Sequence, residues 1–395
     1  MNNSFRIKDV RVWTVSKESK GGDYFNQGGD EHWLVDSLIS NPMSAYSEYK
    51  TKRTSWGIDV LGSIIVELVA EDGTIGVATG TGGFPAAWLI SNHFSRFLVE
   101  QDARNINLIW DQMYRASMPY GRKGITLMAI SAIDLALWDL VGKVRGEPVY
   151  NLIGGISSDE ISFYCTGPKA GPIKEMGFWG AKVPLPYGPA DRKEGLIKNV
   201  EFLSSQRETV GPGFPLMVDC YMSLNVRYAI ELAEACKELE IHWWEEVLPP
   251  EDVNGYRQIR QAHPKLMWTT GEHEYTRFGF RPLIEDRLID ILQPDVMWVG
   301  GLTELLRIAA HASSLEIPII PHGSGPYSYH FIASQTTLPL CEYVASSADG
   351  YTILPVFGDL FDGEDVPEKG KLKISQKPGF GMTVRNRSVL QKLPV

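Results

Sequence analysis

Six ionisable residues in the second half of the chain recur at a regular spacing. Each ends or nearly ends an apolar run, neighbouring members lie 20 to 27 residues apart, and the six are Asp219, Glu245, Glu272, Asp295, His322 and Glu342. A single acid at such a place is more often the N-cap of the following helix, but caps do not explain six in register. One strand and one helix fill about this length, so the six would meet at the mouth of a parallel barrel. Barrel enzymes place their active sites there, and the spacing therefore predicts one active site.

The first three acids of this series suit a metal ion. Asp219, Glu245 and Glu272 would bring three carboxylates together from consecutive strands, and hard oxygen ligands of this kind suit Mg²⁺. Glu245 is preferred over its neighbour Glu246 because side chains alternate across a strand, so that only one of the two can face the mouth. The chain thus predicts a magnesium site held by these three residues.

The later residues of the series suit proton abstraction. A buried Asp295 bonded to one imidazole nitrogen of His322 would fix the tautomer of the ring and raise the basicity of its other nitrogen. Glu342, on the last strand, could hydrogen-bond a substrate oxygen if it is protonated. A metal ion beside a histidine base suits removal of the proton next to a carboxylate, because the ion offsets the charge that develops there.

The elements that must position these residues begin near residue 160, where short apolar runs alternate with helical stretches. Eight runs are strand candidates, namely ISFYCTG, AKVPL, PLMVDC, IHWWEEV, LMWTTGE, DILQPDV, IPIIPHG and LCEYVA. Alternation of strands with helices implies parallel βαβ units, and eight of them imply a TIM-type barrel. We place this barrel at residues 156–355, followed at 356–395 by a tail that returns to the first domain.

The first part of the chain, residues 1–155, reads as an α+β domain. Residues 5–15 alternate as a strand does, and Asp72-Gly73 is a good turn between two further strands. Between them, residues 17–57 form a long stretch rich in aromatic side chains. A loop of that length inside a domain is usually functional or disordered, and the aromatic content favours a function.

The clearest helix of this domain runs from Ile125 to Val144. Apolar residues recur there on one face, and Gly146 and Pro148 follow in the order expected at a helix end. Two acids inside it, Asp134 and Asp139, are expected to be solvated or capping rather than catalytic.

The composition is that of an ordinary globular protein of two or three domains. The 395 residues are 44% hydrophobic and 22% charged, and the net charge of −10 argues against a nucleic-acid partner. Four cysteines without CxxC spacing are typical of reduced thiols. Neither a signal peptide nor an apolar run approaching the length of a membrane span is visible. We therefore expect a cytoplasmic protein without a nucleic-acid or membrane partner.

Several longer motifs resemble the mandelate racemase branch of the enolase superfamily. They are AIDLALWDLVGKVRGEPVYNLIGG, VDCYMS, WWEEVLPPED, TTGEHE, LQPDVMWVGGLTE, IPIIPHG and KPGFGM. The resemblance implies an α/β fold in which a modified TIM barrel, (β/α)7β, carries an α+β capping domain. It also implies that Asp219, Glu245 and Glu272 bind Mg²⁺ and that Asp295 and His322 form a catalytic dyad, with Glu342 at the eighth strand.

Finer features resemble the L-rhamnonate dehydratases of that branch. These are WWEE in the fourth strand, His273 directly after the third metal ligand, and the N-terminal HW and PMS…Y…R segments. The likeness implies His32 and Arg53 as substrate contacts from the loops over the barrel mouth, and His273 as a further catalytic residue. Lys182 would bind the substrate or neutralise charge near the site.

One departure from the branch bears on the reaction. Many relatives end the second barrel strand with Lys-x-Lys, whose second lysine is a base on the face opposite the histidine, whereas here Lys182 is followed two positions later by Pro184. Racemisation needs acid and base groups on both faces, so a racemase is disfavoured. Syn elimination needs only His322, which would take the C2 proton and then help the C3 hydroxyl to leave.

The resulting prediction is dehydration of an acid sugar, with L-rhamnonate converted to its 2-keto-3-deoxy acid. Two alternatives stay open: a dehydratase or epimerase acting on another aldonate or aldarate, and a barrel that has lost catalysis and only binds. The clustered charges argue against the second, because a retired site has no physical reason to keep them. We expect a small-molecule acid-sugar substrate and a homo-oligomer.

Overall fold

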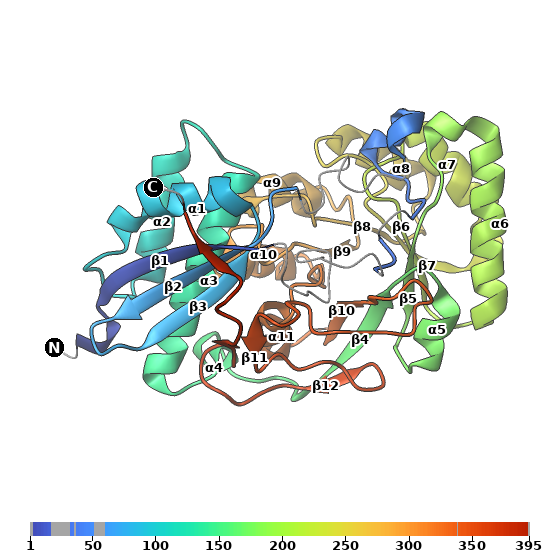
Figure 1. Cartoon of the computed structure of the whole chain (residues 1–395). Helices are drawn as coiled ribbons and strands as arrows, with labels where there is room; N and C mark the ends of the chain where they lie inside the picture. The colour runs from blue at the N-terminus through green and yellow to red at the C-terminus, as the bar shows by residue number, and fades with distance from the viewer. Residues whose placement is uncertain (1–2, 17–31, 35–36, 51–59, 338, 394–395) are drawn as a thin grey trace.

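The chain forms an α+β domain with an antiparallel sheet and an α/β domain with a curled parallel sheet (Figure 1). The computed structural model describes residues 3–16, 32–34, 37–50, 60–337 and 339–393. Figure 1 shows the antiparallel sheet on the left, the parallel sheet on the right, and both chain ends on the left. The predicted combination of a barrel-type α/β domain with an α+β capping domain is confirmed. The predicted boundaries near residues 155 and 355 remain a proposal.

The capping domain is built on a four-stranded antiparallel sheet. In spatial order its strands are β14 (Leu390–Lys392), β1 (Ile7–Val15), β2 (Ile64–Ala70) and β3 (Ile75–Gly80). The turn between β2 and β3 contains Gly73 at φ +89°, a backbone conformation that glycine adopts without strain. The edge strand β14 lies in the C-terminal tail, which therefore packs against the first domain.

The helices of the first part of the chain are α1 (Gly83–Asn92), α2 (Ile106–Ser117), α3 (Ile125–Arg145) and α4 (Val149–Leu152), with 3₁₀ turns at η1 (Asn3–Phe5), η2 (Pro42–Ala45), η3 (Ser47–Tyr49) and η5 (Phe94–Phe97). Helices α1 and α3 contact the sheet, whereas η2 contacts η6 (Pro189–Asp191) of the second domain. The helix predicted from Ile125 is α3, and Gly146 ends it in the left-handed conformation, at φ +70°.

Helix α3 is the central helix of the capping domain. It has 21 residues, and an 18-residue window within it has a mean hydropathy of 1.7, so by length and composition this helix could cross a membrane, contrary to the expectation from the sequence. However, 83% of its apolar window is buried inside the protein. It contacts β2 and β3 as well as α1, α2 and α10 (Gly301–Ser313). A helix enclosed in this way is apolar on nearly all sides.

The expectation that Asp134 and Asp139 of α3 are solvated was wrong, because both are fully buried. Asp134 accepts a hydrogen bond of 2.9 Å from the backbone N–H of Thr303 and so caps the first turn of α10. Asp139 accepts from the backbone N–H groups of Val77 and Phe380, at 2.8 and 2.9 Å. Capping was thus the correct alternative for Asp134, whereas Asp139 binds N–H groups of a strand and of the C-terminal tail.

Seven parallel strands form the sheet of the second domain. In spatial order they are β10 (Leu340–Val344), β4 (Glu160–Thr166), β5 (Ala181–Pro184), β6 (Leu216–Asp219), β7 (Ile241–Glu245), β8 (Trp268–Thr270) and β9 (Ile291–Leu292). Helices between and after them are α5 (Ala170–Glu175), α6 (Arg192–Val210), α7 (Val226–Ala235), α8 (Val253–Ala262), α9 (Thr276–Glu285), α10 and α11 (Pro326–Ser334), with 3₁₀ turns η6 (Pro189–Asp191) and η7 (Lys237–Leu239). Seven of the eight predicted runs therefore contain a strand.

The eighth run, IPIIPHG, makes only an isolated parallel bridge, between Ile319 and Leu292 of β9. Pro318 and Pro321 lie on either side of this bridge, and proline has no N–H to donate to a ladder. The segment still runs alongside β9, because the N–H of His322 donates to the carbonyl of Pro294 at 3.2 Å. His322 therefore reaches the same end of the sheet as the strand-end acids.

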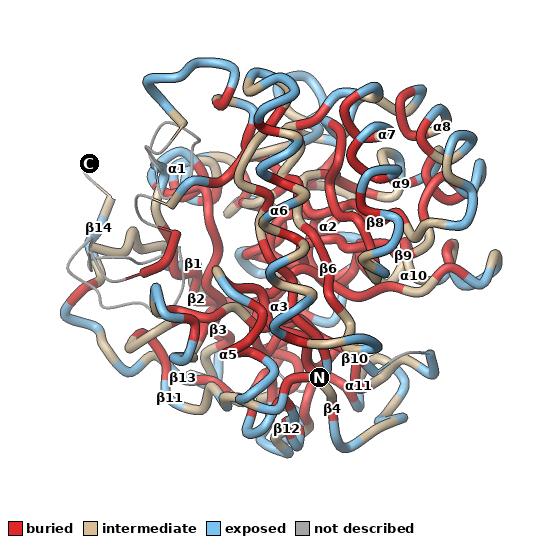
Figure 2. The backbone as a smooth tube through the Cα atoms, turned by 90° about the vertical axis from the view of Figure 1, so that its right-hand side faces the viewer, coloured by how far each residue is buried: buried red, intermediate tan, exposed pale blue. Residues whose placement is uncertain are grey.

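The tail adds short strands to both domains. β12 (Lys371–Lys373) pairs with β4 of the barrel, β11 (Phe361–Asp362) pairs with β13 (Thr383–Val384), and β14 completes the capping sheet. Figure 2 shows that the strands and the inner sides of the helices are buried, while the outer turns of helices such as α6 and α8 are exposed.

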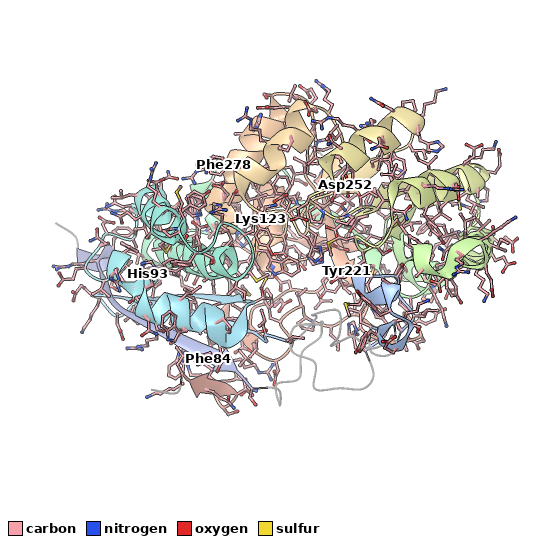
Figure 3. All side chains as sticks on the ribbon, turned by 90° about the horizontal axis from the view of Figure 1, so that it is seen from above. Phe84, His93, Lys123, Tyr221, Asp252 and Phe278 are labelled. Atoms are coloured by element: carbon pink, nitrogen blue, oxygen red, sulfur yellow. The ribbon has the colours of Figure 1, made fainter. Side chains whose placement is uncertain are left out.

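The two domains are joined by specific contacts as well as by apolar packing. The indole N–H of Trp110 donates to the carbonyl of Gly300 at 2.7 Å, and Lys123 pairs with Glu274 at 2.7 Å. Figure 3 shows Lys123 between the helices of the capping domain and those of the barrel. These contacts hold the loop before α3 close to the segment that follows β8.

Candidate active site

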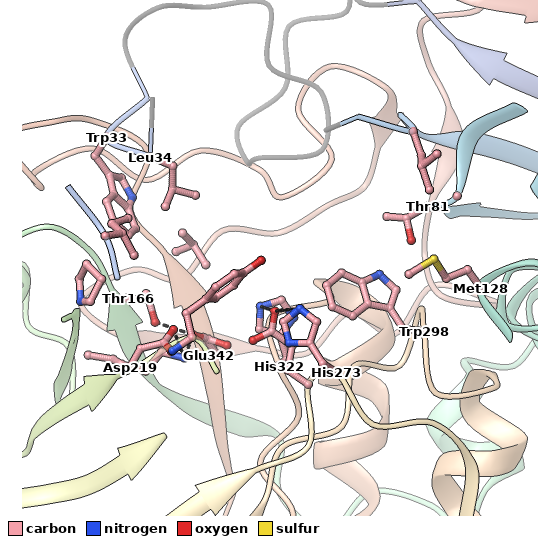
Figure 4. A pocket seen from close by; sticks show the side chains of 18 of the residues that line it. Trp33, Leu34, Thr81, Met128, Thr166, Asp219, His273, Trp298, His322 and Glu342 are labelled. Atoms are coloured by element: carbon pink, nitrogen blue, oxygen red, sulfur yellow. Dashed lines mark hydrogen bonds and ion pairs between the residues drawn. The ribbon is translucent and has the colours of Figure 1, made fainter. Parts of the chain in front are cut away.

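A cavity of about 300 Å³ lies at the C-terminal ends of the parallel strands (Figure 4). Ionisable barrel residues form its floor, namely Lys182, Asp219, Glu272, His273, His322 and Glu342. Residues of the capping domain, among them Thr81 and Met128, form part of its wall. A site of this size between two domains is typical of small-molecule enzymes.

The strand-end acids of the floor are buried together. Burial raises the pKa of Asp219 to about 6 and the pKa values of Glu245 and Glu272 to about 7. Nearby carboxylates add to the rise, because like charges disfavour ionisation of one another. Hard oxygen ligands that repel one another in a buried site are what a divalent cation stabilises, so the floor can hold Mg²⁺.

Glu245 and Glu246 both lie at the mouth, contrary to the alternation argument. Strand β7 ends at Glu245, and Glu246 has φ +44°, so the alternation of a strand no longer applies after Glu245. Glu245 accepts from the indole N–H of Trp243 at 3.1 Å and from the amide of Gln293 at 2.6 Å, and it pairs with Lys182. Glu245 therefore faces the lysine side of the floor.

Glu246 faces the opposite side, toward His273. Its carboxylate accepts from the backbone N–H of His273 at 3.2 Å and lies 2.9 Å from the ring Nδ1. Possible ligand atoms of Glu246, Glu272 and His273 lie within 4.8 Å of one another. Within the described part of the chain, the expected trio of Asp219, Glu245 and Glu272 does not meet the same distance criterion. Lys182 contacts two of its members, Asp219 and Glu245.

Lys182 is fully buried and paired with three carboxylates. Its ammonium group contacts Glu245, lies 2.8 Å from Glu342 and lies 3.8 Å from Asp219. Burial alone would lower the pKa of Lys182, but these carboxylates raise it well above its ordinary value. The lysine is therefore charged and neutralises the floor.

The surroundings of Glu342 favour its ionised form, so the protonated carboxyl that a hydrogen bond to a substrate oxygen would require is not favoured. Burial would raise its pKa, but Lys182 and His322 bring the pKa below the ordinary value. The carboxylate accepts from Thr166 and from the backbone N–H of Gly323, the latter at 3.0 Å. A carboxylate with these donors fixes Lys182 rather than donating to a substrate oxygen.

His322 and Asp295 form the predicted pair. The ring Nδ1 of His322 lies 2.7 Å from a carboxylate oxygen of the fully buried Asp295, and Nε2 lies 3.4 Å from Glu272. Burial alone would lower the pKa of His322, but Glu272, Asp295 and Glu342 raise it to about 10. Because Asp295 occupies Nδ1, the nitrogen Nε2 is the one that can exchange a proton in the cavity.

A second histidine–carboxylate pair lies beside the first. His273 is bonded to Glu246, and its Nε2 lies 4.0 Å from Glu272. Burial alone would lower the pKa of His273, but Glu246 and Glu272 raise it to about 9. His273 lines the cavity. The sequence predicted His273 as a site residue but preferred Glu245 over Glu246, so only one member of this pair was predicted.

The loop residues expected over the mouth are placed in part. His32 is buried and forms an antiparallel bridge with Ser347, next to Trp33 and Leu34, which line the cavity. Trp33 donates from its indole N–H to the carbonyl of Ala345 at 2.6 Å. Arg53 lies outside the described residues.

Several cavity residues were missed by sequence reasoning. Thr166 ends β4 and Tyr221 lies two residues after β6, so the strand-end rule that found the acids could have found these two, whereas Trp298 lies six residues after β9. Thr81 and Met128 come from the capping domain, where no spacing in the sequence singles them out.

Comparisons with protein families match both halves of the chain. Residues 173–388 match the model of an enolase C-terminal domain-like family, and residues 54–154 match the N-terminal domain of mandelate racemase and muconate lactonizing enzyme. A protein of Caldivirga maquilingensis, named as a candidate L-rhamnonate dehydratase, is 46% identical over 98% of this chain and 96% of its own length.

Solved structures are similar over the same length. The rhamnonate dehydratase of Gibberella zeae complexed with Mg is 58% identical with a TM-score of 0.94, and covers 98% of this chain and 96% of its own. The 3,6-anhydro-D-galactonate cycloisomerase of Zobellia galactanivorans is 28% identical with a TM-score of 0.77, and covers 98% and 100%.

Proposed function

The chain belongs to the mandelate racemase and muconate lactonizing enzyme family of the enolase superfamily, and on that premise we propose that it is a magnesium-dependent acid-sugar dehydratase. The observation that carries the proposal is a His322–Asp295 pair beside three carboxylates that line one cavity, those of Asp219, Glu272 and Glu342. The names of the similar proteins, and the Mg bound in one of their structures, support the same reaction class.

The residues of the floor fit a magnesium ion. We propose Asp219, Glu245 and Glu272 as its ligands, since their raised pKa values reflect burial and mutual repulsion that a dication relieves. Bound there, Mg²⁺ would supply positive charge to a substrate carboxylate as the neighbouring carbon is deprotonated. Lys182 neutralises the floor from the other side and is proposed to face the same substrate carboxylate.

His322 is the proposed base, in the neutral form that Mg²⁺ on Glu272 would favour, because the charge of Glu272 is the main cause that raises the pKa of this ring. Its Nε2 faces the cavity while Asp295 holds Nδ1, so the ring can take the proton from C2 of the substrate and keep its orientation. The same Nε2–H can then donate that proton to the departing C3 hydroxyl. This syn route uses one face of the substrate and needs no second base, in keeping with Pro184 at the place where relatives carry a second lysine.

His273 is proposed to assist at the floor. Its ring is held by Glu246 and by contacts with Tyr221 and Trp298, at centroid distances of 5.3 and 5.4 Å. A ring fixed on both sides presents Nε2 to the cavity in one orientation. This is the arrangement expected of a residue that donates to a substrate oxygen.

L-rhamnonate is the proposed substrate. Trp33, Leu34 and Ile39 form an apolar wall of the cavity that suits the C6 methyl group of this sugar acid. A methyl group in an apolar pocket discriminates by only about 1–3 kcal/mol, so L-mannonate is expected to react more slowly without being rejected. His32 and Arg53 remain proposed substrate contacts from the sequence resemblance.

A cytoplasmic location and a homo-oligomeric assembly also remain proposals.

A screen of acid sugars tests the function directly. The protein is incubated with a library of aldonates and aldarates in Mg²⁺, and 2-keto-3-deoxy products are detected. We expect turnover of L-rhamnonate, loss of turnover in chelator, and recovery when Mg²⁺ is restored. Epimer formation without a 2-keto product would favour the epimerase alternative, and full activity in chelator with no bound metal would refute the metal assignment. A preference for a hexarate would overturn the substrate while leaving the reaction class in place.

A further inference from the structure

Two polar groups on the cavity wall have no hydrogen-bond partner within the described part of the chain. They are the hydroxyl of Thr81, just after β3, and the indole N–H of Trp298, three residues after Asp295. Thr81 is 9% exposed and Trp298 is 8% exposed, so bulk water hardly reaches either. An unpaired buried polar group costs about 1–3 kcal/mol. Because both residues line the cavity, a bound molecule can supply the missing partner.

The two groups lie on the same side of the cavity. Figure 4 shows Thr81 and Trp298 close to Met128, across from Trp33 and Leu34. The indole of Trp298 packs against the rings of His273 and His322, at centroid distances of 5.4 and 5.7 Å. This wall therefore adjoins the proposed base on the side away from Asp219.

The chemistry of the two groups favours a hydroxyl as their partner. An indole N–H can only donate, so it needs an acceptor, whereas the hydroxyl of Thr81 can donate or accept. One sugar hydroxyl satisfies both. Its oxygen accepts a hydrogen bond from the indole N–H of Trp298, and the hydroxyl of Thr81 either accepts a hydrogen bond from it or donates a second one to it. A carboxylate is less suited to this wall. Among the described residues that line the cavity, the one lysine or arginine is Lys182, and it lies on the floor among three carboxylates.

We propose that Thr81 and Trp298 form a subsite for one hydroxyl on C4 or C5 of the acid sugar, and so contribute to substrate specificity. The inference rests on the proposed function, in which C1 to C3 occupy the floor beside His322. Carbons beyond C3 then pass the wall that adjoins His322. A site built to hydrogen-bond a hydroxyl rejects analogues that lack it, because its own polar groups stay unpaired.

The test combines substitutions with deoxy substrates. We compare wild type, Thr81→Val and Trp298→Phe on L-rhamnonate and on its 4-deoxy and 5-deoxy analogues. Each substitution is expected to lower kcat/KM for L-rhamnonate by about tenfold, chiefly through KM for Thr81→Val. With the analogue that lacks the bound hydroxyl, wild type should itself lose about tenfold and Thr81→Val should lose little more.

Matched variants separate the hydrogen bonds from general effects. Thr81→Ser keeps the hydroxyl and is expected to recover most of the loss seen in Thr81→Val. Trp88→Phe removes an indole N–H from α1, where Trp88 is 50% exposed and does not line this cavity, and it should leave kcat/KM unchanged.

Two outcomes would overturn the subsite. Wild-type kcat/KM in Thr81→Val and Trp298→Phe would show that neither group binds substrate, and equal losses on every analogue would show that no particular hydroxyl is recognised. In both cases wild type still dehydrates L-rhamnonate, so the proposed function stands. If wild type neither dehydrates nor, by calorimetry in Mg²⁺, binds any acid sugar, the proposed function falls and the subsite falls with it.

Discussion

Two of the regions that hold carboxylates with little exposure to solvent are the mouth of the barrel and helix α3 of the capping domain. At the mouth, Asp219 and Glu272 face other ionisable side chains around a cavity. On α3, Asp134 and Asp139 are more deeply buried than Asp219, but they accept backbone N–H groups from other segments and do not line the cavity. Burial of an acid is thus no sign of catalysis by itself. What distinguishes the mouth is a set of charges that face one another and an open space.

The comparison is tested most strongly at His322. Replacing His322 with Asn removes the base and keeps a group that can donate to Asp295, so turnover should fall by about 10²–10⁴-fold or more while the fold is retained. Exchange of the C2 hydrogen with solvent deuterium measures the chemical step, and circular dichroism measures the fold. Asp295→Asn should cost less, because it disturbs the orientation and basicity of the ring without deleting it. Normal exchange in His322→Asn would assign the base elsewhere.

Asp139 should show the opposite behaviour. It pairs with Lys143 at 2.6 Å and accepts two backbone N–H groups, from Val77 in β3 and Phe380 in the tail. An Asn at this position turns an NH₂ toward one of these donors and weakens the ion pair, so the free energy of unfolding should fall by about 3 kcal/mol. Urea denaturation measures the loss. Turnover per folded molecule should stay near wild type, and a selective loss of turnover would place α3 in the chemistry.

Asp134 should make stability depend on pH without affecting the reaction. Burial raises the pKa of Asp134 to about 7, although its hydrogen bond from Thr303 opposes the rise. The folded state therefore disfavours the charged form. The penalty is absent below the unfolded pKa near 4, grows as the pH rises, and is complete above about 7.

Asp134→Asn mimics the protonated form and removes that penalty. The variant should be more stable than wild type at both pH 5 and pH 8, and its advantage in free energy of unfolding should be about 2 kcal/mol larger at pH 8. Urea denaturation at both pH values measures this. A difference between the two proteins that is the same at both pH values would mean that Asp134 does not titrate in this range.

Many residues at the mouth of the barrel could be predicted from the sequence, because the spacing between strand ends can be read directly along the chain. The positions Asp219, Glu272, Asp295 and His322 follow from where apolar runs end, and the structure brings Asp219, Glu272 and His322 to one floor, with Asp295 against His322. The run IPIIPHG was predicted as a strand and is not one, because prolines remove its donors. Even so, His322 keeps its place.

The capping domain could not be read in the same way. Thr81 reaches the cavity only because β3 and the loops of the barrel pack together, and no spacing in the sequence records that contact. Whether Asp134 and Asp139 are solvated or buried likewise depends on what packs over α3. The ionised state of Glu342 also escaped prediction, because it depends on Lys182 and His322, which come from distant parts of the chain.

The smallest expected effect separates two neighbours at the mouth, Glu245 and Glu246. As the proposed ligand, Glu245→Gln should weaken Mg²⁺ binding about tenfold more than Glu246→Gln, which acts only through the orientation of His273. Both substitutions keep size and remove one charge, so each is the control for the other. Calorimetric titration with Mg²⁺ measures the affinities in the absence of substrate. If Glu246→Gln had the larger effect, the metal would lie on the side of the floor where Glu246, Glu272 and His273 converge, and the proposed ligand set would be wrong at one position.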